Sequence, residues 1–82
     1  MKIYKIYKNK KIMQINKQIG EKIKIFRKQL GLQANKLAEL LSISPSYLNL
    51  IESGKRNIDA DLLLKICQEL RLNFLILRMR QM

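Results

Sequence analysis

Apolar residues recur at intervals of three and four along most of this 82-residue chain, which is the spacing of amphipathic helices. Gly20 interrupts the first stripe and weakens a helix interior by about 1 kcal/mol relative to alanine, so we place the firm part of the first helix at 18–29. Gly31 then offers a left-handed cap onto which Leu32 can fold back. The stripe comprises Ile12, Ile15, Ile19, Ile23, Phe26 and Leu30.

Two short helices follow, joined by a three-residue turn at 42–44. The second helix begins near Gln33. Ser44 and Pro45 predict the start of the third, because a serine oxygen can accept an unpaired backbone N–H and proline loses nothing at the first helical position. Gly54 ends the third helix after about Ser53. The apolar residues of the second helix are Leu37, Ala38, Leu40 and Leu41.

The pattern becomes less decisive towards both ends of the chain. A fourth helix begins at Asp59 or Ala60 and reaches Leu70, with Asp59 and Asp61 at the positive end of its dipole. After Asn73, the segment FLILRMR fits a fifth helix or a strand. Residues 1–11 fit a basic arm or an edge strand whose lysines discourage pairing, and we favour the arm.

Length and composition narrow the class of protein. A chain this short builds one core at most, and its apolar runs fall far below the ~20 residues of a membrane helix. No export signal pattern stands at the start, so we expect a cytoplasmic location. Cys67 is the only cysteine and histidine is absent, which predicts no disulfide, no metal site and no cofactor. We interpret Cys67 as a small buried hydrophobe.

The same inventory argues against an enzyme, because histidine, a cysteine pair and a phosphate-cradling glycine loop are all missing. The net charge of +11 calls for an anionic partner, either nucleic acid or an acidic membrane surface. Six lysines and no acid lie in residues 1–17, whereas 33–56 is almost neutral. The charge therefore predicts a polyanion-binding arm and does not identify a surface that reads sequence.

Residues 33–53 have the physical outline of a helix-turn-helix, with two short helices and a tight turn between them. Ala38 is small where two helices would cross, and Ile43 can pack the turn. The inward face of this unit comprises Leu37, Ala38, Ile43, Leu48 and Ile51, and the outward face comprises Pro45, Ser46, Asn49 and Leu50.

The stretch GLQANKLAELLSISPSYLNLIESGKRNIDADLLLKICQEL resembles the Cro/C1-type (XRE-like) helix-turn-helix family over residues 18–72. Its most specific pieces are Leu37-Ala38, Ser44, Ser46-Tyr47, Ile51-Glu52 and Gly54-Lys55. The run SPSYLNLIESGKRNI is especially similar to the N-terminal domains of short-chain fatty-acid metabolism regulators. The effector-binding region of those longer relatives has no counterpart in these residues, so acyl sensing is not carried over.

The resemblance implies an all-α bundle of four to five helices behind a basic arm at 1–17, with a domain at 18–72 and an apolar, basic tail at 73–82. It also implies a sequence-specific, double-stranded DNA-binding transcriptional regulator of the repressor kind, associated with the nucleoid. In such proteins the third helix, here 45–53, enters the major groove and flanking residues hold phosphates.

Carried over position by position, the resemblance places Pro45, Ser46, Asn49 and Leu50 against base edges. Ser44, Ser53, Lys55, Arg56 and Gln33 match backbone-contacting positions. Asn49 is the strongest reader, because its amide can donate to and accept from adenine, whereas Leu50 suits a thymine methyl. Simpler readings remain open: Asn49 as a solvated residue, Tyr47 as half-buried scaffold instead of a phosphate contact, and Lys55 with Arg56 as a polar loop.

The resemblance also implies an ion pair between Arg27, near the end of the first helix, and Glu52 in the third, with a structural role. Two positions depart from the family pattern. Ala34 replaces a glutamine that commonly clamps a phosphate, and Ser42 replaces the turn glycine. A serine can adopt the left-handed backbone conformation of this turn only with some strain. These departures leave open a weakly binding member of the family.

The tail at 73–82 is too apolar to be free. It could cover the core of a monomer or pack against its mate in a homodimer, which we favour. An alternative function is an antitoxin-like interaction module with a toxin partner and autoregulatory DNA binding. A third reading is a membrane-surface peptide at residues 1–11, where lysine alternates with isoleucine and tyrosine.

Overall fold

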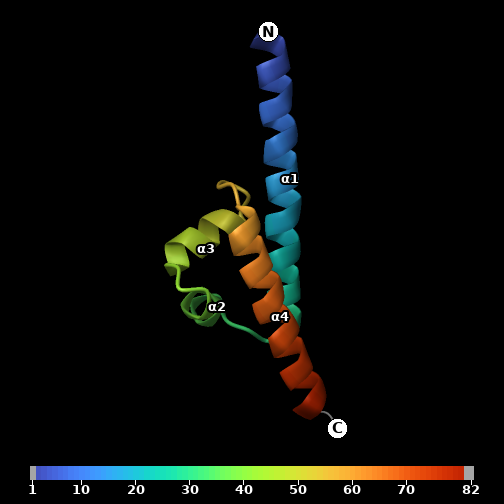
Figure 1. Cartoon of the computed structure of the whole chain (residues 1–82), viewed down its shortest axis with the longest axis vertical. Coiled ribbons are helices and arrows are strands. Elements are labelled where there is room, and N and C mark those ends of the chain that lie inside the picture. Colours follow the sequence, from blue (N-terminus) through green and yellow to red (C-terminus); the bar gives the residue numbers. More distant parts are fainter. Residues whose placement is uncertain (1, 81–82) are drawn as a thin grey trace.

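The computed structural model describes the backbone of residues 2–80 and the side chains from Gln14 to Arg80. This part of the chain forms four helices, α1 (Lys2–Gln29), α2 (Ala34–Leu40), α3 (Pro45–Glu52) and α4 (Ala60–Arg80), and no strand. The expected all-α class is therefore confirmed. The long helices α1 and α4 run beside each other, the short α2 and α3 lie to one side, and the first half of α1 projects beyond the rest (Figure 1).

The N-terminal segment differs from the expected arm. Helix α1 is continuous from Lys2, so residues 2–17 are neither an arm nor an edge strand in the structure. No proline or glycine stands between Lys2 and Gly20, and lysine, methionine and glutamine are good helix formers. Gly20 lowers the stability of the helix itself, but it is required by the tertiary packing, because this residue lies against α3. Residue 1 lies outside the described residues.

The core is a single cluster to which every helix and the α2–α3 turn contribute. On α1, Ile23 is buried and Ile19 is half-buried, but Ile15 and Phe26 are 46% and 41% exposed. Leu30, directly after α1, is half-buried. The other elements therefore cover only part of the apolar stripe of α1. The buried apolar residues are Ile23, Leu37, Ala38, Leu41, Leu48, Ile51, Leu62, Ile66 and Leu70.

Helices α1, α2 and α3 all end in the same way, in a left-handed residue. Gly31, Ser42 and Gly54 have φ values of 68°, 57° and 77°. At the first end, Leu32 N donates to Arg27 O and Gly31 N to Lys28 O, and equivalent pairs close the other two. This is the Schellman pattern, which satisfies the last free carbonyls of a helix and turns the chain sharply. Serine carries the strain of positive φ that glycine avoids.

Helix α4 is longer than the pattern predicted. Asp59 Oδ1 accepts from Leu62 N at 2.7 Å and caps its start. The helix then passes Leu70 without a break and reaches Arg80, so the described part of the tail is neither a separate fifth helix nor a strand. No glycine or proline lies in 60–80, and Asn73 stays within the helix while donating to Glu69 O. Residues 81–82 of the tail fall outside the described residues.

The whole molecule is elongated, with principal extents of 56 × 23 × 19 Å. Its long dimension follows α1 and the end of α4 (Figure 1). Among the helices that the structure describes, none has the length and apolar content needed to cross a membrane.

Candidate nucleic-acid interface

Helix α3 is held by local capping at both ends. Ser44 is the N-cap, and its Oγ accepts from Tyr47 N at 3.0 Å, while Pro45 occupies the first turn. At the other end Ser53 N donates to Asn49 O, and Ser53 Oγ donates to Leu50 O at 3.1 Å. The start of α3 that serine and proline predicted is confirmed. Its caps are local hydrogen bonds, so they stabilise the ends of the helix independently of tertiary contacts.

The two faces of α3 separate cleanly. Leu48 and Ile51 are buried in the core at 0% and 2% exposure, and Glu52 is buried beside them. The half-buried Ile43 packs under the turn that precedes the helix. The opposite face is exposed, so the rest of the described chain leaves it open to a partner. Its residues are Pro45, Ser46, Asn49 and Leu50.

The residues expected to hold phosphates lie at the two ends of α3, in the loop after it and at the start of α2. Gln33 is the N-cap of α2 and makes no side-chain capping bond, so its amide stays available. Lys55 and Arg56 follow the end of α3 in the loop that leads to α4. All of these side chains are exposed: Gln33, Ser44, Ser53, Lys55 and Arg56.

Tyr47 is half-buried and packs against the core. The Arg56 guanidinium lies 5.0 Å from the centre of its ring, a distance at which the cation and the ring attract. Sequence reasoning missed this pairing, because neither residue type nor spacing signals it. The contact stiffens the loop after α3 and holds the Arg56 charge near the open face.

Arg27 of α1 and Glu52 of α3 lie in direct contact. Arg27 Nε donates to Glu52 Oε2 at 2.8 Å and Nη2 donates to Oε1 at 3.1 Å, so the contact is bidentate. Arg27 Nη1 also donates to Leu32 O at 2.8 Å. Both residues are buried, with exposures of 7% and 8%. The pair fixes α3 to the end of α1 and to the loop before α2, and so fixes the direction of the open face.

Gly20 makes a second junction between α1 and α3 that the sequence did not reveal. A Cβ at this position would lie 2.2 Å from Ile51 O and 2.8 Å from Glu52 O. Both are backbone atoms, so a side chain here would force the helices apart. Gly54 is similarly tight, because its Cβ would lie 2.6 Å from Lys17 Cα. A glycine inside an otherwise regular stripe was the available signal, since such glycines often mark close packing.

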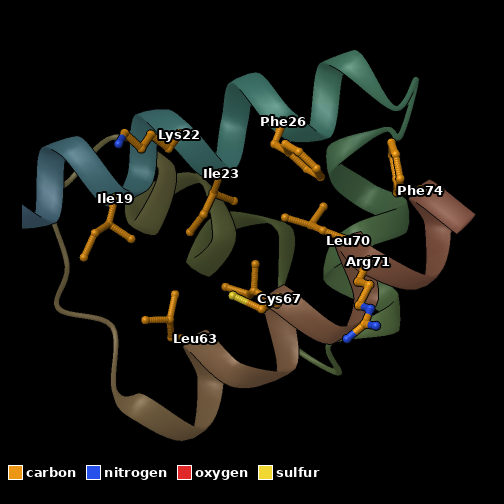
Figure 2. A pocket seen from close by; sticks show the side chains of 10 residues that line it. Ile19, Lys22, Ile23, Phe26, Leu63, Cys67, Leu70, Arg71 and Phe74 are labelled. Atoms are coloured by element: carbon orange, nitrogen blue, oxygen red, sulfur yellow. The ribbon is translucent and has the colours of Figure 1, made fainter.

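The side of α1 that faces α4 is different. An open apolar hollow of about 450 Å³ lies between these helices. Figure 2 shows Phe26 of α1 and Leu63, Leu70 and Phe74 of α4 directed towards it, with Lys22 and Arg71 at its margins. Cys67 lines this hollow and is exposed, so our interpretation of it as a buried hydrophobe was wrong. The helical spacing correctly placed Cys67 beside Leu63 and Leu70 on one side of α4. That side borders the open hollow, so the thiol is not covered.

Comparisons with known proteins agree with this geometry. The family model described as helix-turn-helix matches residues 23–77. Among solved structures, the clp gene regulator ClgR from Corynebacterium glutamicum is similar, with a TM-score of 0.66 and 31% sequence identity over 67% of this chain and 58% of that chain. This chain thus spans little more than half of that protein's length. A comparison with curated proteins finds no significant match.

The match covers the last quarter of α1, all of α2 and α3, and most of α4. It therefore includes the Arg27–Glu52 pair and the open face of α3. The chain belongs to the Cro/C1-type helix-turn-helix family of DNA-binding transcriptional regulators.

Proposed function

We propose that this protein is a sequence-specific repressor that reads duplex DNA by inserting α3 into the major groove. One observation carries the proposal: α3 is capped and tied to α1 on its buried side, while the opposite side is uncovered. A rigid helix with a free polar face suits a groove about 12 Å wide, because an α-helix with its side chains has about that diameter.

The roles of the open-face residues follow from their chemistry. The Asn49 amide can make two hydrogen bonds to adenine, and Leu50, 36% exposed, can meet a thymine methyl group. Ser44, Lys55, Arg56 and Gln33 hold phosphates on either side, and Ser53 joins them when its hydroxyl proton turns from Leu50 O to the phosphate. Ala34 supplies no donor where relatives carry glutamine, and Gln33, which makes no side-chain capping bond, supplies an amide that can anchor this end of α2.

The repressor assignment rests on the part of a promoter that the bound protein would cover. A helix-turn-helix unit bound over a promoter fills the groove and contacts the backbone that a polymerase needs. The described residues place the cations Lys55 and Arg56 beside the reading helix, which favours firm seating on the backbone. ClgR, whose printed description is that of a gene regulator, supports a regulatory role for the shared unit.

We infer a homodimer formed through the end of α4. Leu72, Leu75, Ile76 and Met79 follow one stripe of this helix and are 53%, 45%, 43% and 72% exposed. A second copy packed on this stripe would cover it.

Selection of bound sites from random duplex DNA tests the function. We expect a two-fold symmetric consensus from the full chain, because a dimer presents two copies of α3. Asn49→Ala should relax one position in each half-site and weaken binding about tenfold to a hundredfold. Gln68→Ala, which shortens an exposed amide on α4, should change neither. Recovery of no consensus would overturn the proposal.

The hollow between α1 and α4 favours a second candidate function, an antitoxin-like module. Its lining is apolar, and its charged neighbours Lys22 and Arg71 are both basic, which suits an acidic amphipathic helix of a toxin. Co-expression with the product of a neighbouring reading frame tests this. A stable complex that Phe74→Glu abolishes, with DNA binding retained, would establish it, and absence of any complex would remove it.

A further inference from the structure

The first part of α1 has a composition unlike the rest of the chain. Six of the 17 lysines and arginines lie in residues 1–17, and no acidic residue accompanies them. The structure makes this segment part of a continuous helix. At 1.5 Å per residue, residues 2–17 span about 24 Å, and Figure 1 shows this length projecting beyond the other helices.

The projecting segment leaves the fold beside the loop that follows α3. The backbone of Lys17 lies against Gly54, close enough that a Cβ on Gly54 would clash with it. The Asn16 amide donates to Asn57 Oδ1. Lys55 and Arg56 stand between these two contacts in sequence. The end of the segment, at Asn16 and Lys17, therefore lies next to the loop that carries the cations we assign to phosphates.

We infer that residues 2–17 extend the DNA-binding surface along the phosphate backbone, outside the half-site that α3 reads. This inference rests on the proposed function and adds a second contact region to it. Duplex DNA carries one negative charge per 1.7 Å of axis, so a lysine-bearing helix of about 24 Å can follow about seven base pairs. The segment adds affinity and salt dependence without reading sequence.

The distribution of the lysines favours DNA over a membrane surface. A helix that lies in a membrane interface needs one broad apolar face and one charged face. Lysines at positions 2, 5, 8, 10, 11 and 17 fall all around a helix of 3.6 residues per turn, which leaves no broad lysine-free face. A polyanion that meets the helix through long-range attraction requires no such separation.

The test compares two full-length variants with equal loss of charge. One replaces lysines of the projecting segment by glutamine, a similar helix former: Lys2, Lys5, Lys8 and Lys11. The matched control replaces exposed cations far from it by glutamine: Lys24, Lys28, Arg71 and Arg78. Affinity for the selected duplex is measured over a range of salt concentrations, and hydroxyl-radical footprints are recorded.

We expect the first variant to lower the slope of log affinity against log salt by about two to three, since each lost phosphate contact changes it by about 0.9. Its footprint should shorten by up to about seven base pairs on the side of the α3–α4 loop. The control should change the slope by less than one and leave the footprint intact. Replacing the same four lysines by arginine should restore parental behaviour.

Equal slopes for both glutamine variants, or an unchanged footprint, would overturn the inference. Binding to phosphatidylserine vesicles that the first variant loses, with the DNA slope unchanged, would also overturn it in favour of a membrane surface. Failure of the proposed function looks different: no consensus would be selected and Asn49→Ala would have no effect, while the lysine variant would still lose slope on any duplex.

Discussion

The two sides of helix α1 are packed differently. Towards α3, Gly20 lets backbone meet backbone, and the bidentate Arg27–Glu52 pair is buried nearby. Towards α4, the side chains of Phe26 and Phe74 border an open hollow of about 450 Å³. The same helix thus has one side where a single added atom cannot fit and one side with room to spare.

The two sides of α1 have different roles in positioning the neighbouring helices. The tight side carries α3, whose position decides where the open face points. The loose side carries α4, whose exposed apolar residues suit an additional partner. Substitutions on the two sides should therefore differ strongly in their effect on the free energy of unfolding, and three of them test the comparison.

The largest effect is expected for Glu52→Ala. Removal of the carboxylate leaves the buried Arg27 guanidinium without its charge partner, which costs about 3–5 kcal/mol. Thermal unfolding measures this, and Glu21→Ala, which removes an exposed carboxylate from α1, serves as the control. A variant that melts at the parental temperature would show that the pair contributes nothing. The paired change Arg27→Met with Glu52→Leu should recover most of the loss.

A smaller effect is expected for Gly20→Ala. In an isolated helix this change stabilises by about 1 kcal/mol, but here the new Cβ would lie 2.2 Å from Ile51 O. We expect a net loss of about 2–3 kcal/mol, because α3 must shift as a whole. Gln18→Ala, at an exposed position two residues away, should be nearly neutral. Stabilisation by Gly20→Ala would contradict the close contact.

The smallest effect is expected for Cys67→Ser, on the loose side. An exposed position tolerates this change within about 0.5 kcal/mol, whereas a buried thiol replaced by an unpaired hydroxyl would lose about 1–3 kcal/mol. The adjacent Ile66→Ala, at a fully buried position, should cost about 2–5 kcal/mol. A large loss from the serine variant would mean that the hollow is closed in solution.

The reading helix could be predicted from the sequence because its signals are local. Ser44 and Pro45 mark its start within two residues, and Gly54 marks its end. The alternation of buried Leu48 and Ile51 with exposed Asn49 and Leu50 follows from helical periodicity. Such features depend on neighbours in the chain, so no knowledge of the tertiary structure was needed.

The errors concern features that depend on distant partners. Gly20 looked like a weakness because the carbonyl oxygens that require it belong to α3. Cys67 shares the period of buried residues, but burial also depends on whether another helix covers that side. The segment 2–17 resembles an arm in sequence because isoleucine and tyrosine favour strands and alternate there with lysine, and its anchor on the 54–57 loop cannot be seen from sequence.

The uninterrupted course of α4 has a consequence for target spacing. A dimer joined through Leu72, Ile76 and Met79 would be coupled by a stiff rod with no hinge between the core and the interface. One base pair inserted between half-sites rotates one of them by about 35° around the DNA axis. A jointed tether would absorb that rotation, but an unbroken helix transmits it, so such a dimer should tolerate a single centre-to-centre distance.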